Sequence, residues 1–226
     1  MQARTCHIVS LDLGQQQDPS ALAVLERAEH TDRAAYDCVE LRRWHLGTPY
    51  PRIVEDVLGL LADSRLADPV LVVDQTGVGR PVVDLFRWRV GCPFRPVTIT
   101  SGFTWSREPN GDYRVPKKDL AAAVQALLGY RRLQIAAELP EARTLVEEMQ
   151  AFRVKVTKAG NESFAADWRE GKHDDLVLAV ALAAWVGEHC CAGTLEDATR
   201  GAAASEMSRA PEGVWANKEA DEEEQP

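Results

Sequence analysis

The stretch Gly171-Lys-His-Asp174-Asp175-Leu-Val-Leu-Ala-Val-Ala-Leu-Ala-Ala-Trp185 decides the fold. Leu and Ala predominate in it, and neither Gly nor Pro follows Gly171, so the composition favours a helix. After Asp175 the helix is apolar on every face, which is typical of a helix buried in the middle of a domain. The sequence therefore predicts a central helix over 171–185.

Two adjacent carboxylates, Asp174 and Asp175, stand at the start of this helix. An Asp at that position commonly caps the helix or interacts favourably with its dipole. Two acids in a row, preceded by Lys172 and His173, are also candidate metal ligands. From this stretch alone both interpretations remain open.

The composition indicates one soluble domain followed by a tail. A length of 226 residues and a hydrophobic fraction of 45% allow a real core. No apolar run is long enough to span a membrane, and no secretory signal is visible at the N-terminus. The five cysteines are an odd number without CxxC spacing, so we expect neither a disulfide scaffold nor a structural zinc site. This cysteine pattern favours a protein of the reducing cytoplasm.

The net charge of −9 is concentrated near the C-terminus, where residues 187–226 hold ten acidic and three basic residues. The body of the chain is close to neutral, so overall charge neither supports nor excludes a nucleic-acid partner. From residue 191 the chain is rich in Ala, Gly, Ser and Glu, which predicts a disordered acidic tail over 191–226.

Hydrophobic periodicity predicts an α/β domain over 1–190 with a mixed sheet flanked by helices. The expected strands cover 5–13, 21–28, 36–45, 69–74, 94–99, 131–136, 153–157 and 163–166. The expected helices cover 51–61, 81–88, 116–128, 140–152 and 171–185. A loop is expected from Thr100 to Val115, and short links suggest that the first three strands form antiparallel hairpins.

Further acids end two of the expected strands: Asp12 ends the first and Asp74 ends the β-branched run 69–74. If those strands are neighbours, both carboxylates emerge at one end of the sheet, where the central helix could bring Asp174 and Asp175. Clustered carboxylates repel one another and need a cation or raised pKa values. Hard divalent ions with oxygen ligands, Mg²⁺ or Mn²⁺, are the natural partners, and two of them can drive phosphodiester hydrolysis.

Four motifs in this order resemble the nuclease domain of the large terminase subunit of tailed bacteriophages. They are Asp12-Leu-Gly14, Val73-Asp74-Gln-Thr-Gly77-Val-Gly79, Val115-Pro-Lys-Lys-Asp-Leu120 and Lys172-His-Asp-Asp175-Leu-Val-Leu-Ala. The resemblance implies a ribonuclease-H-like fold and a two-metal endonuclease that cuts concatemeric viral DNA during packaging. It assigns the catalytic and metal-binding roles to Asp12, Asp74 and the Asp174/Asp175 pair. Of that pair we favour Asp175, which adjoins the face expected to pack on the sheet.

One part of that family is missing from the sequence. A packaging ATPase would carry a GxxxxGK[ST] loop, and the glycines at 77 and 79 lack its Lys and its spacing. We therefore expect a stand-alone nuclease whose motor is encoded elsewhere, or a prophage remnant, acting in the cytoplasm of a bacterial host. The expected partners are double-stranded DNA and a separate packaging ATPase, small terminase subunit or portal, without a membrane.

Basic residues near these acids are candidate DNA contacts. They are Arg80, Arg114, Lys117, Lys118, Lys172 and His173. Other interpretations remain open: a non-catalytic DNA-binding or assembly module, or another ribonuclease-H-like nuclease such as a resolvase. A sugar-kinase or actin-like ATPase is disfavoured because such proteins need two similar halves.

Overall fold

The computed structural model describes residues 5–14, 18–30, 33–77, 79–156, 162–165 and 174–191, and within them the fold is built on one mixed sheet of eight strands. The strands lie in the order β6-β7-β5-β4-β1-β2-β3-β8. Their bounds are β1 Thr5–Asp12, β2 Ala21–Glu29, β3 Ala34–Arg43, β4 Val70–Asp74, β5 Phe94–Thr100, β6 Ser106–Arg107, β7 Tyr113–Pro116 and β8 Leu133–Ile135. A separate antiparallel pair is formed by β9 (Arg153–Val156) and β10 (Glu162–Ala165).

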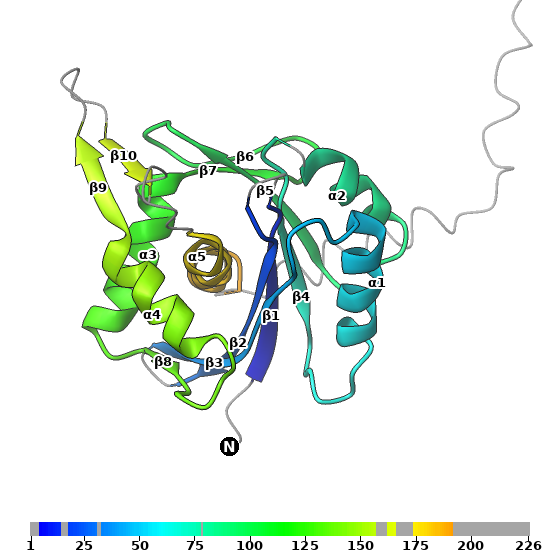
Figure 1. Cartoon of the computed structure of the whole chain (residues 1–226), viewed down its shortest axis with the longest axis horizontal. Helices are drawn as coiled ribbons and strands as arrows, with labels where there is room; N and C mark the ends of the chain where they lie inside the picture. The colour runs from blue at the N-terminus through cyan, green and yellow to red at the C-terminus, as the bar shows by residue number, and fades with distance from the viewer. Residues whose placement is uncertain are drawn as a thin grey trace, which may run out of the picture. The chain divides into compact units, whose positions relative to one another are not determined.

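Helices cover both faces of the sheet (Figure 1). Their bounds are α1 Tyr50–Leu61, α2 Gly79–Arg87, α3 Lys117–Gly129, α4 Ala142–Ala151 and α5 Asp175–His189. Helices α1 and α2 lie on one side of β1 and β4, and α3, α4 and α5 lie on the other. Among the described residues, none of the helices is both long enough and apolar enough to span a bilayer.

Alternation along β1 directs its side chains to two different cores. Val9 and Leu11 belong to the apolar cluster that packs against α1 and α2. Because successive side chains of a strand point to opposite faces, Ser10 and Asp12 face α5 instead. The Ser10 hydroxyl lies 2.6 Å from the carbonyl oxygen of Ala179 in α5, to which it donates a hydrogen bond. This face of β1 therefore carries one buried hydroxyl, that of Ser10, and ends in the carboxylate of Asp12.

Most of the predicted elements are confirmed, including the antiparallel β1-β2-β3 hairpins and the parallel pairing of β1 with β4. The loop expected from Thr100 to Val115 is partly wrong. Within it, β7 adds to β5 in parallel and β6 pairs with β7. These short strands lie at the edge of the sheet, where Gly102, Pro109 and Gly111 obscure any periodicity. The predicted acidic tail and the domain boundary at 190 stay predictions, since residues 192–226 lie outside the described ranges.

Helix α5 is the innermost helix, as its composition predicts. Every residue from Asp175 to Gly187 is buried. Its C-terminal end is fixed by Glu188, whose carboxylate accepts hydrogen bonds from Tyr36 Oη at 2.6 Å and from Arg132 at 2.7 and 2.8 Å. The first three residues of the predicted 171–185 helix lie outside the described residues, and the structure begins α5 at Asp175.

Gly187 lets α5 approach the sheet closely. A Cβ atom at this position would lie 2.5 Å from Tyr36 Cε1 and 2.9 Å from Ile8 Cδ1. Both neighbours are fully buried, so they cannot move aside without disturbing the core. A glycine inside a helix ordinarily lowers stability, and the tolerance of one here follows from this contact.

Gly187→Ala should therefore lower the free energy of unfolding by about 1–3 kcal/mol, the usual cost of overpacking a core. Chemical denaturation followed by circular dichroism measures it. The matched control is Gly59→Ala in α1, where an added Cβ meets nothing within 4 Å. That control should gain up to about 1 kcal/mol from helix propensity. A stabilising effect of both variants would show that α5 has room to shift at Gly187.

Candidate active site

Two buried carboxylates, Asp12 and Asp74, end adjacent parallel strands. The register pairs Leu11 of β1 with Val73 of β4, so the two acids are the next residues on their strands. Alternation places both on the face that α5 covers. Asp12 is 7% exposed and Asp74 is 8% exposed. The structure thus brings together the first two acids that the sequence predicts, at one end of the sheet.

This proximity changes the protonation of both groups. Burial raises the pKa of Asp12 well above its usual range, and repulsion from Asp74, Asp175 and Asp174 raises it further. Burial also raises the pKa of Asp74, although hydrogen bonds from Thr76 and Asp12 act in the opposite direction. Burial at the ends of two adjacent strands therefore raises the pKa of both carboxyl groups.

Thr76 fixes the orientation of Asp74. One carboxylate oxygen of Asp74 accepts hydrogen bonds from the Thr76 backbone N–H at 2.8 Å and from its hydroxyl at 2.5 Å. That hydroxyl in turn accepts one from the backbone N–H of Ile99 in β5 at 2.8 Å. The start of α2 packs directly on this turn, because a Cβ on Gly79 would lie 2.1 Å from the Asp74 carbonyl oxygen. The carboxylate is consequently held in one orientation.

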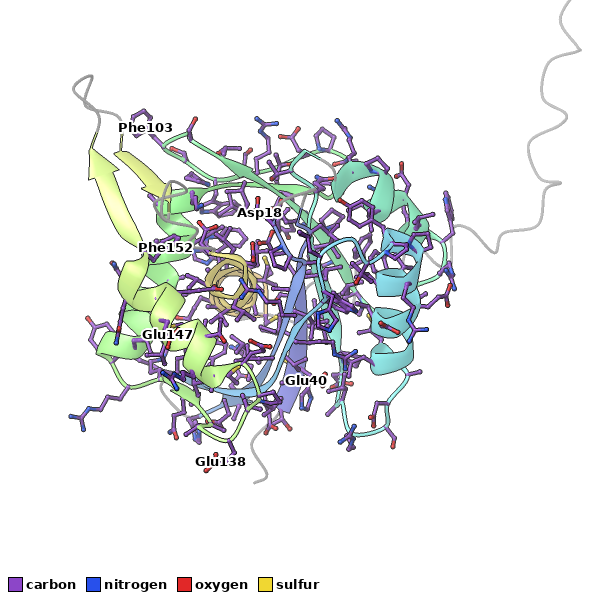
Figure 2. All side chains as sticks on the ribbon, viewed as in Figure 1. Asp18, Glu40, Phe103, Glu138, Glu147 and Phe152 are labelled. Atoms are coloured by element: carbon purple, nitrogen blue, oxygen red, sulfur yellow. The ribbon has the colours of Figure 1, made fainter. Side chains whose placement is uncertain are left out.

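Asp174 precedes α5 and binds a lysine. Its carboxylate lies 2.7 Å from the ammonium of Lys117, the first residue of α3. The same ammonium lowers the pKa values of Asp12 and Asp74, so its charge acts on three of the four acids. Lys117 Nζ also lies 5.5 Å from the ring centroid of Phe152, which Figure 2 labels beside α5. In this structure Lys117 therefore neutralises carboxylates; its predicted DNA contact stays a prediction.

Asp175, the first residue of α5, contacts an arginine that the sequence interpretation did not include. Arg43, at the end of β3, lies 2.7 Å from the Asp175 carboxylate and 2.8 Å from that of Glu148 in α4. All three side chains are largely buried. One guanidinium group thus joins a strand and two helices at the start of α5.

Glu148 also performs the capping that the sequence left open for Asp174 or Asp175. Its carboxylate accepts hydrogen bonds from the backbone N–H groups of Leu176 at 3.0 Å and Val177 at 3.2 Å. Burial raises the pKa of Glu148 to about 7, against the lowering effect of Arg43 and these N–H groups. A signal for Glu148 exists in the sequence: it shares the buried face of α4 with Ala142 and Leu145 at a spacing of three.

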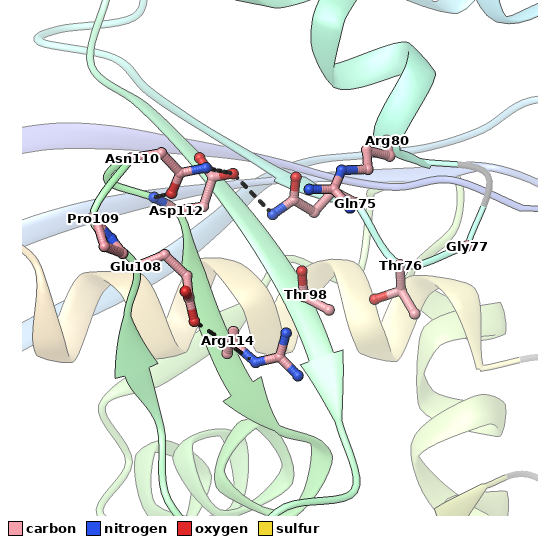
Figure 3. Close-up of a pocket in the computed structure, with 10 residues that line it drawn as sticks. All are labelled: Gln75, Thr76, Gly77, Arg80, Thr98, Glu108, Pro109, Asn110, Asp112 and Arg114. Atoms are coloured by element: carbon pink, nitrogen blue, oxygen red, sulfur yellow. Dashed lines mark hydrogen bonds and ion pairs between the residues drawn. The ribbon is translucent and has the colours of Figure 1, made fainter.

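The other predicted DNA contacts lie in different places. Lys118 Nζ is 4.7 Å from the ring centroid of Phe103, an exposed side chain that Figure 2 labels. Arg80 and Arg114 line an open pocket beyond Asp74 (Figure 3). Lys172 and His173 lie outside the described residues.

The four acids suit a hard divalent ion by their chemistry. They supply carboxylate oxygens, which Mg²⁺ and Mn²⁺ prefer, and a cation would relieve the repulsion from the other three acids that raises the pKa of Asp12. Within the described ranges, however, no three His, Cys, Asp or Glu side chains already converge closely enough to hold an ion. Lys117 and Arg43 instead pair with Asp174 and Asp175. The four acids therefore suit such an ion by the chemistry of their oxygens, while two of them are paired with Lys117 and Arg43 in this structure.

Solved structures that resemble this fold include viral nuclease domains. The Human cytomegalovirus terminase nuclease domain, Mn-soaked and inhibitor-bound, aligns over 80% of this chain and 82% of its own, with 14% identity and a TM-score of 0.50. The P22 large terminase nuclease domain aligns over 80% and 81%, with 12% identity and a TM-score of 0.51. No protein-family model and no curated protein matches the sequence. At these identities the likeness establishes the fold, and the chain has the ribonuclease-H-like fold of terminase nuclease domains.

Proposed function

We propose that this chain is a divalent-metal-dependent endodeoxyribonuclease that cuts concatemeric viral DNA during genome packaging. The observation that carries the proposal is the pair Asp12 and Asp74, buried side by side at the ends of β1 and β4. Buried acids that repel one another lower stability, and such groups are characteristic of functional sites. The shared fold with terminase nuclease domains adds support.

Asp12, Asp74 and one acid of the Asp174/Asp175 pair would hold Mg²⁺ or Mn²⁺, with two ions expected. When bound, the ions supply Lewis acidity toward the attacking water and the leaving oxygen. Thr76 keeps Asp74 aimed at the site, and Arg43 does the same for Asp175. Water would add its oxygen to phosphorus and give up a proton, one P–O bond would break, and the leaving oxygen would take up a proton. We favour Asp175 over Asp174 because it is the more buried of the two.

Supercoiled plasmid tests this proposal. We expect the chain to nick it with Mg²⁺ or Mn²⁺ and to stop when EDTA is added. Asp74→Asn should lose the activity, since it removes a ligand and leaves the shape of the side chain. Comparing Asp174→Asn with Asp175→Asn in the same assay identifies the ligand of that pair. Asp37→Asn, an exposed acid on β3, is the matched control and should cut like the wild type.

A non-catalytic DNA-binding or assembly module is the second candidate. It is favoured by the cations that already occupy Asp174 and Asp175 at 2.7 Å. In that case the acids serve only to fix α5, and no divalent ion produces nicking. The packaging ATPase, the small terminase subunit and the portal remain proposed partners under either function, in the cytoplasm of a bacterial host.

A further inference from the structure

A polar pocket continues the candidate active site past the end of β4. It has a volume of about 470 Å³ and lies between the Gln75–Gly77 turn, the start of α2 and the β6-β7 hairpin. Figure 3 shows its lining side chains, which include Gln75, Arg80, Asn110 and Arg114. None of the acids assigned to metal binding lines it. It is therefore a neighbouring site with a polar lining of its own.

The pocket is built on a buried carboxylate. Asp112 is 4% exposed and accepts hydrogen bonds from Asn110 Nδ2 at 2.8 Å and Gln75 Nε2 at 3.2 Å. Arg87 of α2 lies 3.6 Å from the same carboxylate and offsets its charge. These contacts join the hairpin to α2 and to the turn after Asp74. The pocket wall is thus fixed in place before any ligand arrives.

Two arginines from different elements supply positive charge to this wall. Arg80 is exposed at the start of α2, where the helix dipole adds to its charge, and within the described residues it has no acidic partner. Arg114 of β7 is half-exposed, and its nearest acid, Glu108, is 3.8 Å away. An exposed pair at that separation is weak, so an anionic ligand can replace Glu108. Guanidinium groups are well suited to phosphate oxygens.

Thr76 connects the pocket to the candidate active site. It lines the pocket, and its backbone N–H and hydroxyl hold the Asp74 carboxylate at 2.8 and 2.5 Å. A nucleic-acid strand whose phosphate is cut at Asp74 would therefore continue over Thr76 into the pocket. There its next phosphates would meet Arg80 and Arg114.

We propose that this pocket binds the phosphodiester backbone of the DNA strand flanking the scissile phosphate, through Arg80 and Arg114. The inference rests on the proposed nuclease function, and it adds a substrate subsite outside the metal centre. The contacts are to phosphate, so they position the strand without reading its sequence.

Binding of a short fluorescent duplex in EDTA, measured by anisotropy from about 50 to 200 mM salt, tests the pocket without cleavage. Each lost phosphate contact reduces the salt slope of the binding constant by about 0.9, so Arg80→Ala/Arg114→Ala should reduce it by about 1.8. The double variant Arg65→Ala/Arg143→Ala loses the same charge from exposed sites outside the pocket and should keep the wild-type slope. Glu108→Gln removes the competing carboxylate and should tighten binding with the slope unchanged.

Equal slopes for the two double variants, or a wild-type chain that does not bind the duplex, overturn the pocket assignment. Plasmid nicking by the same preparations separates this result from the proposed function. If the wild type nicks plasmid but the two double variants have equal salt slopes, the nuclease function is supported and the proposed subsite is wrong. A slope difference without nicking under any divalent ion supports the pocket and leaves the non-catalytic DNA-binding module as the function.

Discussion

Asp12→Asn is expected to abolish plasmid cleavage and, in the same protein, to stabilise the metal-free fold. The side chain is buried beside Asp74, and burial and repulsion raise its pKa. Removing a proposed metal ligand should lower the cleavage rate by more than about 100-fold, because loss of a residue that only supports a ligand can already cost about 10–100-fold. Removing the buried charge should raise the free energy of unfolding by about 1 kcal/mol, within the range of changes that trade function for stability. Plasmid nicking and urea denaturation in EDTA measure the two effects.

The stabilisation should depend on pH in a defined direction. The pKa of Asp12 is higher in the folded chain than in the unfolded chain, so the folded state retains a proton that the unfolded state releases. The free energy of unfolding of the wild type should therefore fall as pH rises from the ordinary Asp range through the raised pKa. Asp12→Asn should show a smaller fall, because Asp74 and Glu148 still contribute. A variant that cuts normally, or unfolds more easily at neutral pH, contradicts the assignment.

Arg43→Met is expected to cause the largest loss of stability of any substitution at this site. Its guanidinium forms ion pairs with both Asp175 and Glu148, at 2.7 and 2.8 Å. Removing one partner of a buried ion pair typically costs about 3–5 kcal/mol, because the remaining charges stay buried. Chemical denaturation should show a loss of that size. Cleavage should fall as well, because Asp175 loses its support from β3.

Two further variants isolate the cause of this loss. Arg143→Met breaks an exposed pair with Glu147 on the same helix, α4, and should change stability by less than about 0.5 kcal/mol. Glu148→Gln keeps an oxygen for the backbone N–H groups of Leu176 and Val177 while removing one buried charge. Combined with Arg43→Met it should recover part of the loss, with a coupling of about 0.5–3 kcal/mol. If the changes in the free energy of unfolding caused by Arg43→Met and Glu148→Gln simply add, Arg43 stabilises the fold through packing alone.

The sequence predicts well those features that depend on a continuous run of apolar or β-branched residues. Helix α5 is apolar on every face and proves to be buried on every face. The run 70–74 is β-branched and forms a strand in the middle of the sheet, paired on both sides. Its terminal Asp74, like Asp12 on β1, was recognisable because strand ends and turn glycines mark it. Their proximity required only that two parallel strands be neighbours.

The features that the sequence does not reveal depend on contacts between distant residues. Arg43 and Glu148 are 105 positions apart, and only the folded chain shows that they meet. Arg43 follows another arginine at a strand end, a position that is usually exposed. Strand β6 has two residues, Ser106 and Arg107, which is too short for a periodicity to appear. Long-range ion pairs and short edge strands of this kind produce no local sequence pattern from which they could be predicted.

The position of α5 has a consequence for protein synthesis. It is the innermost helix, yet it follows every strand of the main sheet along the chain. Until the ribosome has released residues up to His189, α5 cannot cover its face of β1 and β2, and Asp12 and Asp74 lack the two acids at the start of that helix. A nascent chain therefore contains every strand of the main sheet and two of the four acids before α5 has been synthesised. DNA cleavage that needs all four acids can begin only after α5 has been synthesised and has packed on the sheet.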